Sequence, residues 1–203
     1  MSDIVFYHNP QSRGRIVHWM LEEVGAPYRI EFLSFEARDH KKPGYLAINP
    51  MGKIPAIVHN GVVVTEAAAI CAYLADAFPQ AQLAPPGPDA TRGTYLRWLF
   101  FAAGCVEPAI VDRMLARPPA PRPEALGYGS YADVMNALEQ AIAPGPFILR
   151  ERFSAADVYL ASQLSWGMMV NGIESRATFQ AYVARCEERP AFKRFSAQYE
   201  QGK

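Results

Sequence analysis

The chain has 203 residues, half of them hydrophobic and a fifth charged, a composition that excludes a disordered protein and predicts one or two packed domains. Twenty Lys and Arg residues balance twenty Asp and Glu residues, so we expect binding neither to nucleic acid nor to a membrane surface. The chain starts without a leader pattern, and no apolar run reaches the ~20 residues that span a bilayer, which favours a cytoplasmic protein.

The opening of the chain alternates strand and helix patterns. Residues 4–7 form a short apolar strand, and residues 28–32 alternate as a second one. Between them, apolar residues recur at helical spacing until Gly25 ends the helix: Ile16, Trp19, Met20 and Val24. This order predicts a β-α-β unit with parallel strands.

A hairpin and a further helix complete the first domain. Asn60-Gly61 separates two strand-like runs, 56–59 and 62–65, and both central residues of a type I′ turn need positive φ. The dipeptide therefore predicts antiparallel strands. An amphipathic helix follows from Ala67 and ends before Pro79. Residues 1–79 are thus expected to form a βαβ-ββα domain.

The second half is predicted to be helical. Residues 79–88 are too rich in proline for a helix or a central strand, and we place an interdomain linker at 80–90. Helical patterns cover 91–117, 131–142, 155–170, 179–188 and 191–199. The fold class is therefore α/β plus all-α, with a helical bundle domain over 91–203. Most of its aromatic and sulfur-bearing residues belong to the core, but some are candidates to line an apolar pocket: Tyr95, Phe101, Met114, Trp166 and Met169.

The loop Asn-Pro-Met-Gly-Lys-Ile-Pro, which ends at Pro55, is the most specific motif in the chain. A trans Pro55 is tolerated as a strand-initiating residue, and from the residues alone this interpretation is favoured because only about 5–6% of X–Pro bonds are cis. A cis bond would instead turn the backbone of Ile54 outward, ready to pair with an extended peptide ligand.

A resemblance to a known family bears on this choice. The order βαβ, the loop ending in Ile54-Pro55-Ala56, a hairpin, and Thr65-Glu66-Ala67 at the head of a helix together resemble the N-terminal domain of cytosolic glutathione transferases. The resemblance covers nearly the whole chain and continues at Phe-Ser-Ala-Ala-Asp, residues 153–157, which is similar to the family's capping box. It implies a thioredoxin-like first domain and a cis bond before Pro55.

The same resemblance implies the ligands and the assembly. Glutathione is expected as a co-substrate, with no permanently bound cofactor, and a small apolar electrophile is expected as the second substrate, bound through the helical domain. The family is usually dimeric, so a homodimer is expected as well. No metal site is expected, because the three cysteines form no C-x-x-C pair: Cys71, Cys105 and Cys186.

The resemblance also assigns residues to the ligand. The backbone of Ile54, before Pro55, would pair with the cysteinyl part of glutathione, and Glu66 would meet the γ-glutamyl ammonium. Ala67 stands where the family commonly has Ser, so it offers only its backbone N–H; Thr65 is an alternative source of a hydroxyl. A first-turn Glu that merely complements the helix dipole is the plainer interpretation of Glu66.

Three basic residues are candidates for the glycyl carboxylate. A free carboxylate favours a cation nearby. We rank Lys53 first and His40 second, with Lys41 third; a lone Lys on a loop is, however, usually just solvated.

The chemistry requires a thiolate, and three residues are candidates to stabilise it. Lowering a thiol pKa of about 8.5 by ~2 units requires about 2.7 kcal/mol, within reach of one hydrogen bond to a charged group. Ser12 is the first choice, because the first helix is expected to begin near it; the alternative is an ordinary helix cap. Tyr7, at the end of the first strand, is the rival, and Asn9 is the third candidate. No cysteine precedes Cys71, which argues against the family's cysteine-type branches.

The leading functional hypothesis is conjugation of glutathione to the electrophile. Glutathione-dependent isomerisation, dehalogenation or peroxide reduction would use the same site. A non-catalytic ligand-binding or interaction module of this fold is the third hypothesis, to which Ala67 gives some support.

Overall fold

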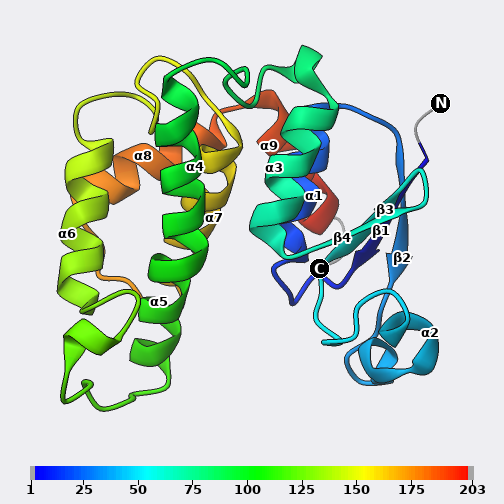
Figure 1. Cartoon of the computed structure of the whole chain (residues 1–203), viewed down its shortest axis with the longest axis horizontal. Coiled ribbons are helices and arrows are strands. Elements are labelled where there is room, and N and C mark those ends of the chain that lie inside the picture. The colour runs from blue at the N-terminus through cyan, green and yellow to red at the C-terminus, as the bar shows by residue number, and fades with distance from the viewer. Residues whose placement is uncertain (1–2, 201–203) are drawn as a thin grey trace. The chain divides into compact units, whose positions relative to one another are not determined.

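The computed structural model describes residues 3–200 of the chain, drawn in Figure 1. The chain divides into two compact units, each considered by itself below. One unit comprises the chain up to Leu83 together with the residues from Pro190 onward, and the other is Ala84–Arg189. The return of the last helix to the first unit was not anticipated from the sequence.

The first unit is built on a four-stranded sheet in the order β2-β1-β3-β4. Its strands are β1 (Ile4–His8), β2 (Tyr28–Phe32), β3 (Ala56–His59) and β4 (Val62–Thr65). β1 and β2 are parallel, whereas β3 is antiparallel to both β1 and β4, so the predicted β-α-β unit and hairpin are confirmed.

The turn signals in the sequence have their expected backbone angles. Asn60 and Gly61 both have positive φ, 50° and 81°, as a type I′ hairpin requires. Gly25 follows α1 (Gly14–Val24) in the left-handed conformation, and its N–H bonds the carbonyl of Leu21. Both breaks in the regular structure were therefore readable from residue type.

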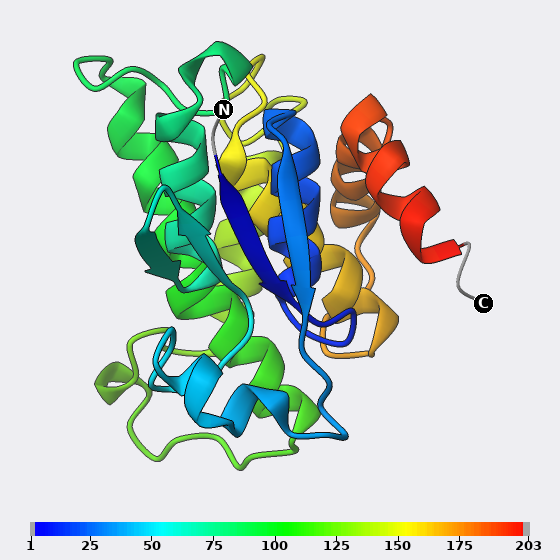
Figure 2. The same ribbon diagram turned by 90° about the vertical axis from the view of Figure 1, so that its right-hand side faces the viewer.

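Three helices of the first unit pack together. α1 contacts both α3 (Ala67–Ala77) and α9 (Pro190–Glu200), as Figures 1 and 2 show. Trp19 of α1, 1% exposed, meets the ring of Phe192 edge-on with 4.8 Å between centroids. The burial of these aromatic rings explains why the last helix belongs with the first unit.

The segment between β2 and β3 contains two short helices that the sequence did not predict. They are a 3₁₀ turn, Asp39–Lys41, and α2 (Pro43–Leu46). Tyr45 of α2 is buried and packs against Ile54 and Ala56, with Tyr7 of β1 at the edge of the cluster. Phe6 of β1 faces α1, because its ring centroid is 5.8 Å from that of His18. Neighbouring strand residues point to opposite faces of the sheet, so α2, which packs on Tyr7, covers the face that α1 does not.

The second unit is helical, as predicted, with one correction. The helix expected over 91–117 is interrupted: α4 (Thr91–Phe101) passes through a π-helical segment, Ala102–Val106, into α5 (Glu107–Met114). A π-helical turn holds one residue more than an α-helical turn, so the apolar face shifts by only one position. The pattern of apolar residues therefore does not reveal it. The proline-rich break follows, with a 3₁₀ turn at Pro123–Ala125.

Three further helices complete this unit: α6 (Tyr131–Ile142), α7 (Ala155–Met169) and α8 (Ala177–Glu187). The predicted linker also contains a 3₁₀ turn at Pro79–Ala81, although it was expected to be irregular throughout. Within residues 3–200, none of the helices is both long enough and apolar enough to cross a bilayer.

The capping box of α7 is confirmed. Asp157 accepts hydrogen bonds from the N–H and hydroxyl of Ser154, at 2.9 and 2.8 Å, and from the hydroxyl of Tyr182 at 2.7 Å. Burial raises the pKa of Asp157 to about 6, against the opposing effect of these hydrogen bonds. The box ties the start of α7 to α8, a structural role.

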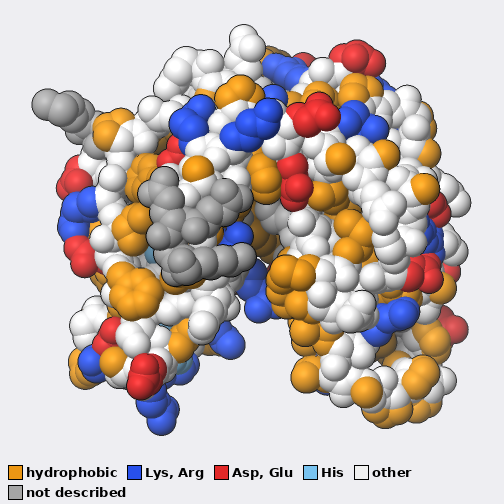
Figure 3. All heavy atoms as spheres, turned by 180° about the vertical axis from the view of Figure 1, so that it is seen from behind, with side chains coloured by type: hydrophobic (Ala, Val, Ile, Leu, Met, Phe, Trp, Pro, Cys, Tyr) orange, Lys and Arg blue, Asp and Glu red, His pale blue; other side chains and the backbone are white. Residues whose placement is uncertain are grey.

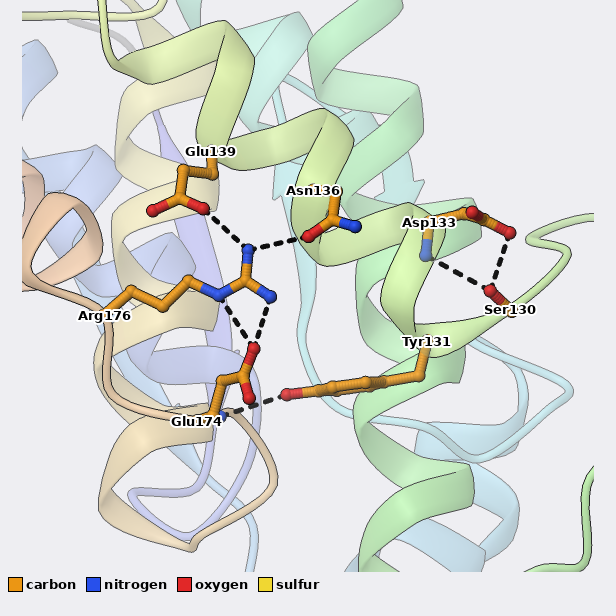
Figure 4. A network of polar contacts seen from close by, with 7 residues as sticks. All are labelled: Ser130, Tyr131, Asp133, Asn136, Glu139, Glu174 and Arg176. Carbon is orange, nitrogen blue, oxygen red and sulfur yellow. Dashed lines mark hydrogen bonds and ion pairs between the residues drawn. The ribbon is translucent and has the colours of Figure 1, made fainter.

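An ion-pair network joins α6 to the segment before α8. Arg176 bonds Glu139 and Asn136 of α6, at 2.8 and 3.0 Å, and pairs with Glu174 on its own segment, as Figure 4 shows. Elsewhere charges of both signs are mixed: on the face drawn in Figure 3, Lys and Arg side chains alternate with Asp and Glu among the described residues.

Candidate functional site

The strand register brings three loops to one end of the sheet. Tyr7 of β1 pairs with Ala56 of β3, and Ala56 pairs with Thr65 of β4. The chain therefore leaves β1, enters β3 and leaves β4 at the same end of the sheet. Candidate residues from all three loops, 9–12, 53–55 and 65–67, therefore lie at that end of the sheet although they are far apart in the sequence.

The loop before β3 has the backbone that the resemblance implies. The Ile54–Pro55 peptide bond is cis. Ile54 is 8% exposed, and within residues 3–200 its own N–H and carbonyl make no hydrogen bond. Backbone groups without partners next to a strand form a ready edge for an extended peptide.

The residue before Ile54 is held from behind. The carbonyl of Lys53 accepts hydrogen bonds from the hydroxyl of Tyr45 and from Nδ2 of Asn49, the latter at 2.9 Å. Asn49 also receives the N–H of Met51 at 3.1 Å. These contacts position the loop, and neither Tyr45 nor Asn49 was identified from the sequence, because a side-chain bond to a distant carbonyl has no local pattern.

Ser12 lies at the start of α1, which begins at Gly14, one or two residues later than expected. Its hydroxyl accepts the N–H of Gly14 at 2.9 Å and donates to the carbonyl of Asn9 at 2.7 Å. The side chain is half-buried. Arg13, not Ser12, is the N-cap residue of this helix, and its side chain makes no cap bond. The hydroxyl of Ser12 is polarised by the first helical N–H, while its own hydrogen lies on a backbone carbonyl.

The two rival donors differ in how far they are engaged. Asn9 is buried, and its side chain donates to the carbonyl of Leu33 at 2.7 Å and accepts the N–H of Gln11 at 2.8 Å, so both ends of the amide hold the loop. Tyr7 is half-buried against the ring of Tyr45, with 5.5 Å between centroids, and its hydroxyl makes no hydrogen bond within the described residues.

The start of α3 presents a carboxylate beside backbone N–H groups. Glu66 precedes the helix with φ of 64°, a conformation that costs a residue with a side chain about 1–3 kcal/mol. Its exposed carboxylate has no ion-pair partner within residues 3–200. No side chain caps this helix, so the first-turn N–H groups, that of Ala67 included, are available to an anion. Thr65 is half-buried beside them.

The basic candidates are arranged around Gly52. Lys41 donates to the carbonyl of Met51 at 2.9 Å, which engages one of its three ammonium hydrogens. A Cβ on Gly52 would meet the carbonyl of His40 at 2.6 Å, so the 3₁₀ turn lies directly against the loop. Nδ1 of His40 is buried and without a partner, and the exposed ammonium of Lys53 makes no ion pair within the described residues.

A buried histidine that the sequence did not single out lies beneath the loop after β1. His8 is 4% exposed, and its Nε2 is 2.9 Å from the hydroxyl of Tyr199 in α9. Burial, with smaller effects from His18 and Arg15, lowers the pKa of His8 to about 3. Within residues 3–200, no cluster of three or more His, Cys, Asp or Glu side chains is placed to hold a metal.

Comparisons with known proteins point to one family. A family model described as the N-terminal domain of glutathione S-transferase matches residues 2–76. Glutathione S-transferase GstA of Escherichia coli is 27% identical over 188 residues, which cover 91% of this chain and 92% of that protein. The glutathione S-transferase-like protein gedE of Aspergillus terreus is 30% identical over 169 residues, 76% of this chain and 73% of that one.

The solved structures point the same way. A glutathione transferase homologue from Sulfitobacter, crystallised with bound glutathione, is 25% identical with a TM-score of 0.79, covering 100% of this chain and 99% of that one. These proteins share their architecture with this chain: a thioredoxin-like domain with a four-stranded mixed sheet, followed by a helical part. The chain belongs to the glutathione S-transferase family.

Proposed function

We propose that the protein conjugates the thiolate of glutathione to small apolar electrophiles. One observation carries the proposal: Tyr7, Ala56 and Thr65 pair side by side across three strands, so the loops next to them lie at one end of the sheet. These loops supply a backbone edge at Ile54, a hydroxyl at the start of α1, and a carboxylate beside free N–H groups at the start of α3. This set matches the tripeptide's central amide, its sulfur and its zwitterionic end.

Glutathione is proposed to lie along the Ile54 edge in extended form. The N–H and carbonyl of Ile54 would pair with the cysteinyl residue, as in strand addition. Glu66 would accept the γ-glutamyl ammonium, and the N–H groups at the start of α3 would hold the neighbouring carboxylate. Lys53 is proposed for the glycyl carboxylate, with His40 second, because the ammonium of Lys41 already bonds Met51.

Ser12 is proposed to stabilise the thiolate. Its hydrogen would turn from the carbonyl of Asn9 to the ligand sulfur, while the N–H of Gly14 keeps polarising the oxygen. A hydrogen bond to a charged group contributes about 1.5–3 kcal/mol, enough to lower a thiol pKa by ~1–2 units. The thiolate then attacks the electrophilic carbon, and the leaving group departs with the bond's electron pair.

The remaining expectations join this proposal. The helical unit is proposed to bind the electrophile, the active form to be a homodimer, and the location to be the cytoplasm. Isomerase, dehalogenase and peroxidase reactions would use the same thiolate, with the glutathione recycled or oxidised. A binding-only module is the second candidate, favoured by the engaged hydrogen of Ser12 and by Ala67, which has no hydroxyl.

The test has two stages. Calorimetric titration with glutathione measures binding, and difference absorbance in the ultraviolet at neutral pH detects bound thiolate. A panel of aryl halides, alkyl halides, isomerisable enones and hydroperoxides then assigns the reaction. Binding with a thiolate band and conjugation supports the proposal; binding without the band, and without turnover of any panel member, supports the module instead.

A further inference from the structure

A partly buried row of polar side chains connects the loop after β1 with the surface of α1. Nε2 of His8 is 2.9 Å from the hydroxyl of Tyr199, which is 2.6 Å from Nδ1 of His18. Nε2 of His18 is 2.8 Å from the hydroxyl of Tyr28, which donates to Glu22 at 2.8 Å. β1, α9, α1 and β2 of the first unit each contribute to this row.

Glu22 fixes the direction of these hydrogen bonds. Its carboxylate also accepts hydrogen bonds from Arg194 and Gln198, both at 3.1 Å. Burial raises the pKa of Glu22, but these hydrogen bonds and that of Tyr28 outweigh burial, so the pKa is lowered. An ionised carboxylate only accepts. The hydrogen of Tyr28 therefore lies toward Glu22, and the oxygen of Tyr28 must accept from Nε2 of His18.

The direction passes on through both histidines. Burial lowers the pKa of His18 and of His8, so both rings are neutral and each carries one hydrogen. With its hydrogen on Nε2, His18 accepts from Tyr199 through Nδ1. The oxygen of Tyr199 then accepts from Nε2 of His8, and this leaves Nδ1 of His8 as a bare acceptor.

That bare nitrogen faces the start of α1. Nδ1 of His8 is buried, and residues 3–200 offer it no hydrogen-bond partner. A Cβ on Gly14 would lie 2.3 Å from it and 2.9 Å from the hydroxyl oxygen of Ser12, so both atoms border the same small space. Buried acceptors without a partner are rare in folded proteins, so we look for a function of this nitrogen beside the hydroxyl of Ser12.

We propose that this row is a proton-transfer chain, which carries the thiol proton of bound glutathione from Ser12 to the carboxylate of Glu22. The inference rests on the proposed function and adds to it a route for the proton. His8 is a positioning residue in this scheme, because it acts on the ligand only through Ser12.

The step balances as a relay. The thiol proton passes to the oxygen of Ser12, and the sulfur keeps its electron pair. The hydroxyl of Ser12 makes no hydrogen bond to His8 in this structure, so it must turn its own hydrogen from the carbonyl of Asn9 and approach Nδ1 of His8. Each later member accepts one proton and donates another, until Glu22 receives one and releases it to solvent. Every hydroxyl and imidazole then carries its hydrogen on the opposite side and turns back before the next proton passes.

Neighbouring charges favour a relay over storage of the proton. Burial is the main cause that lowers the pKa of both histidines, and the guanidinium of Arg15, 4.3 Å from the centroid of the Tyr199 ring, adds to it. Glu22 and Gln198 act in the opposite direction on His18, but its pKa is still lowered. Arg194 pairs with Glu22 at the far end. An imidazolium inside the row is therefore disfavoured, and a proton entering at His8 must leave at Glu22.

The test compares three Tyr→Phe variants. Tyr199→Phe breaks the row near the site, and Tyr28→Phe breaks it far from the site. Tyr73→Phe is the control, because it removes a similar tyrosine–histidine hydrogen bond outside the row, that of Tyr73 to Nδ1 of His59 at 2.9 Å. Stopped-flow absorbance in dilute buffer follows thiolate formation after mixing with glutathione. We expect both row variants to slow it by about 10²-fold or more, within the range of positioned proton transfer. Their affinity and final absorbance should be unchanged, imidazole buffer should restore the rate, and Tyr73→Phe should match wild type.

Other results overturn the inference. A normal rate in Tyr28→Phe excludes transfer to Glu22, and a slow rate that imidazole does not restore indicates a structural effect. If a variant fails to fold, the rate in wild type is measured in mixtures of light and heavy water: a curved dependence on deuterium fraction supports several moving protons, and a straight line contradicts the chain. Failure of wild type to form any thiolate would instead refute the proposed function.

Discussion

Tyr7 and Ala56 stand opposite each other across antiparallel strands β1 and β3, and this pair aligns the two loops that carry the candidate site. One residue beyond Tyr7 lies His8, and one residue before Ala56 lies Pro55. The loop with Ser12 and the edge at Ile54 are therefore neighbours by strand register, whereas 42 positions separate Ser12 from Ile54 in the sequence. The predictions below follow from this juxtaposition and from the packing around it.

Replacing Ser12 by Ala should abolish the thiolate band of bound glutathione while leaving affinity nearly unchanged. The substitution removes the only donor proposed for the sulfur, and we expect kcat to fall by about 10²–10³. Ser12→Thr, which keeps a hydroxyl, should retain most of the band. If Tyr7→Phe loses the thiolate band and Ser12→Ala keeps it, Tyr7 is the donor to the sulfur instead. The hydroxyl of Tyr7 makes no hydrogen bond within the described residues.

Replacing Glu66 by Gln should weaken glutathione binding. The variant keeps the shape of the side chain but removes the charge that faces the ligand ammonium, so we expect about a tenfold rise in Kd, or ~1.4 kcal/mol. Isothermal titration calorimetry measures it. Glu124→Gln, an exposed residue in the other unit, is the matched control and should bind as wild type. Equal affinities in both variants would remove Glu66 from the site.

Replacing Gly by Ala should have opposite effects at two helix positions. A Cβ on Gly14 would lie 2.3 Å from Nδ1 of His8, so Gly14→Ala forces a rearrangement and should cost about 1–3 kcal/mol of unfolding free energy. Gly93 of α4 has open space around it, so Gly93→Ala should stabilise by roughly 0.5–1 kcal/mol. Urea denaturation measures both; a harmless Gly14→Ala would show that His8 is not confined there.

Stability should depend on pH through His8. Its pKa in the folded chain is about 3, below the ordinary 6.5, so below pH 6.5 the unfolded state binds the extra proton. The contribution of His8 is complete above pH 6.5 and is lost as the pH falls toward 3, by up to about 1.4 kcal/mol per pH unit. His8→Gln should therefore show a shallower acid limb in urea denaturation at several pH values.

Asp157 has the opposite dependence, which must be separated from that of His8. Its pKa in the folded chain is raised to about 6, so its contribution is complete below about pH 3.9 and is lost as the pH rises through 6. The difference between wild type and His8→Gln cancels this common effect. An unchanged slope in the variant would mean that His8 is not buried as a neutral ring.

Local signals predicted the elements well. Asn60-Gly61, Gly25 and the Ser154–Asp157 box each act through their own backbone or within one helical turn, so residue type and spacing reveal them. The π-helical segment Ala102–Val106 was missed, because it preserves an apparently continuous helical pattern.

Long-range contacts were beyond the reach of pattern reasoning. The bond from Tyr45 to the carbonyl of Lys53 and the approach of Tyr199 to His8 join residues whose proximity depends on the completed sheet. The candidate site was identified through the family resemblance, and its supporting residues emerged only from the structure. The row from His8 to Glu22 could not be predicted from the sequence for the same reason, since its members come from four elements.

The central claim is that the backbone of Ile54 binds the tripeptide, and amide hydrogen exchange tests it most directly. The exchange rate of the Ile54 N–H is measured by NMR with and without saturating S-methylglutathione, with the exposed N–H of Gly61 at the hairpin turn as reference. The account predicts slowing of at least ~10-fold at Ile54 and none at Gly61, since a new hydrogen bond must open before exchange. An Ile54 amide that exchanges equally fast in both states, while the ligand is bound, would contradict it.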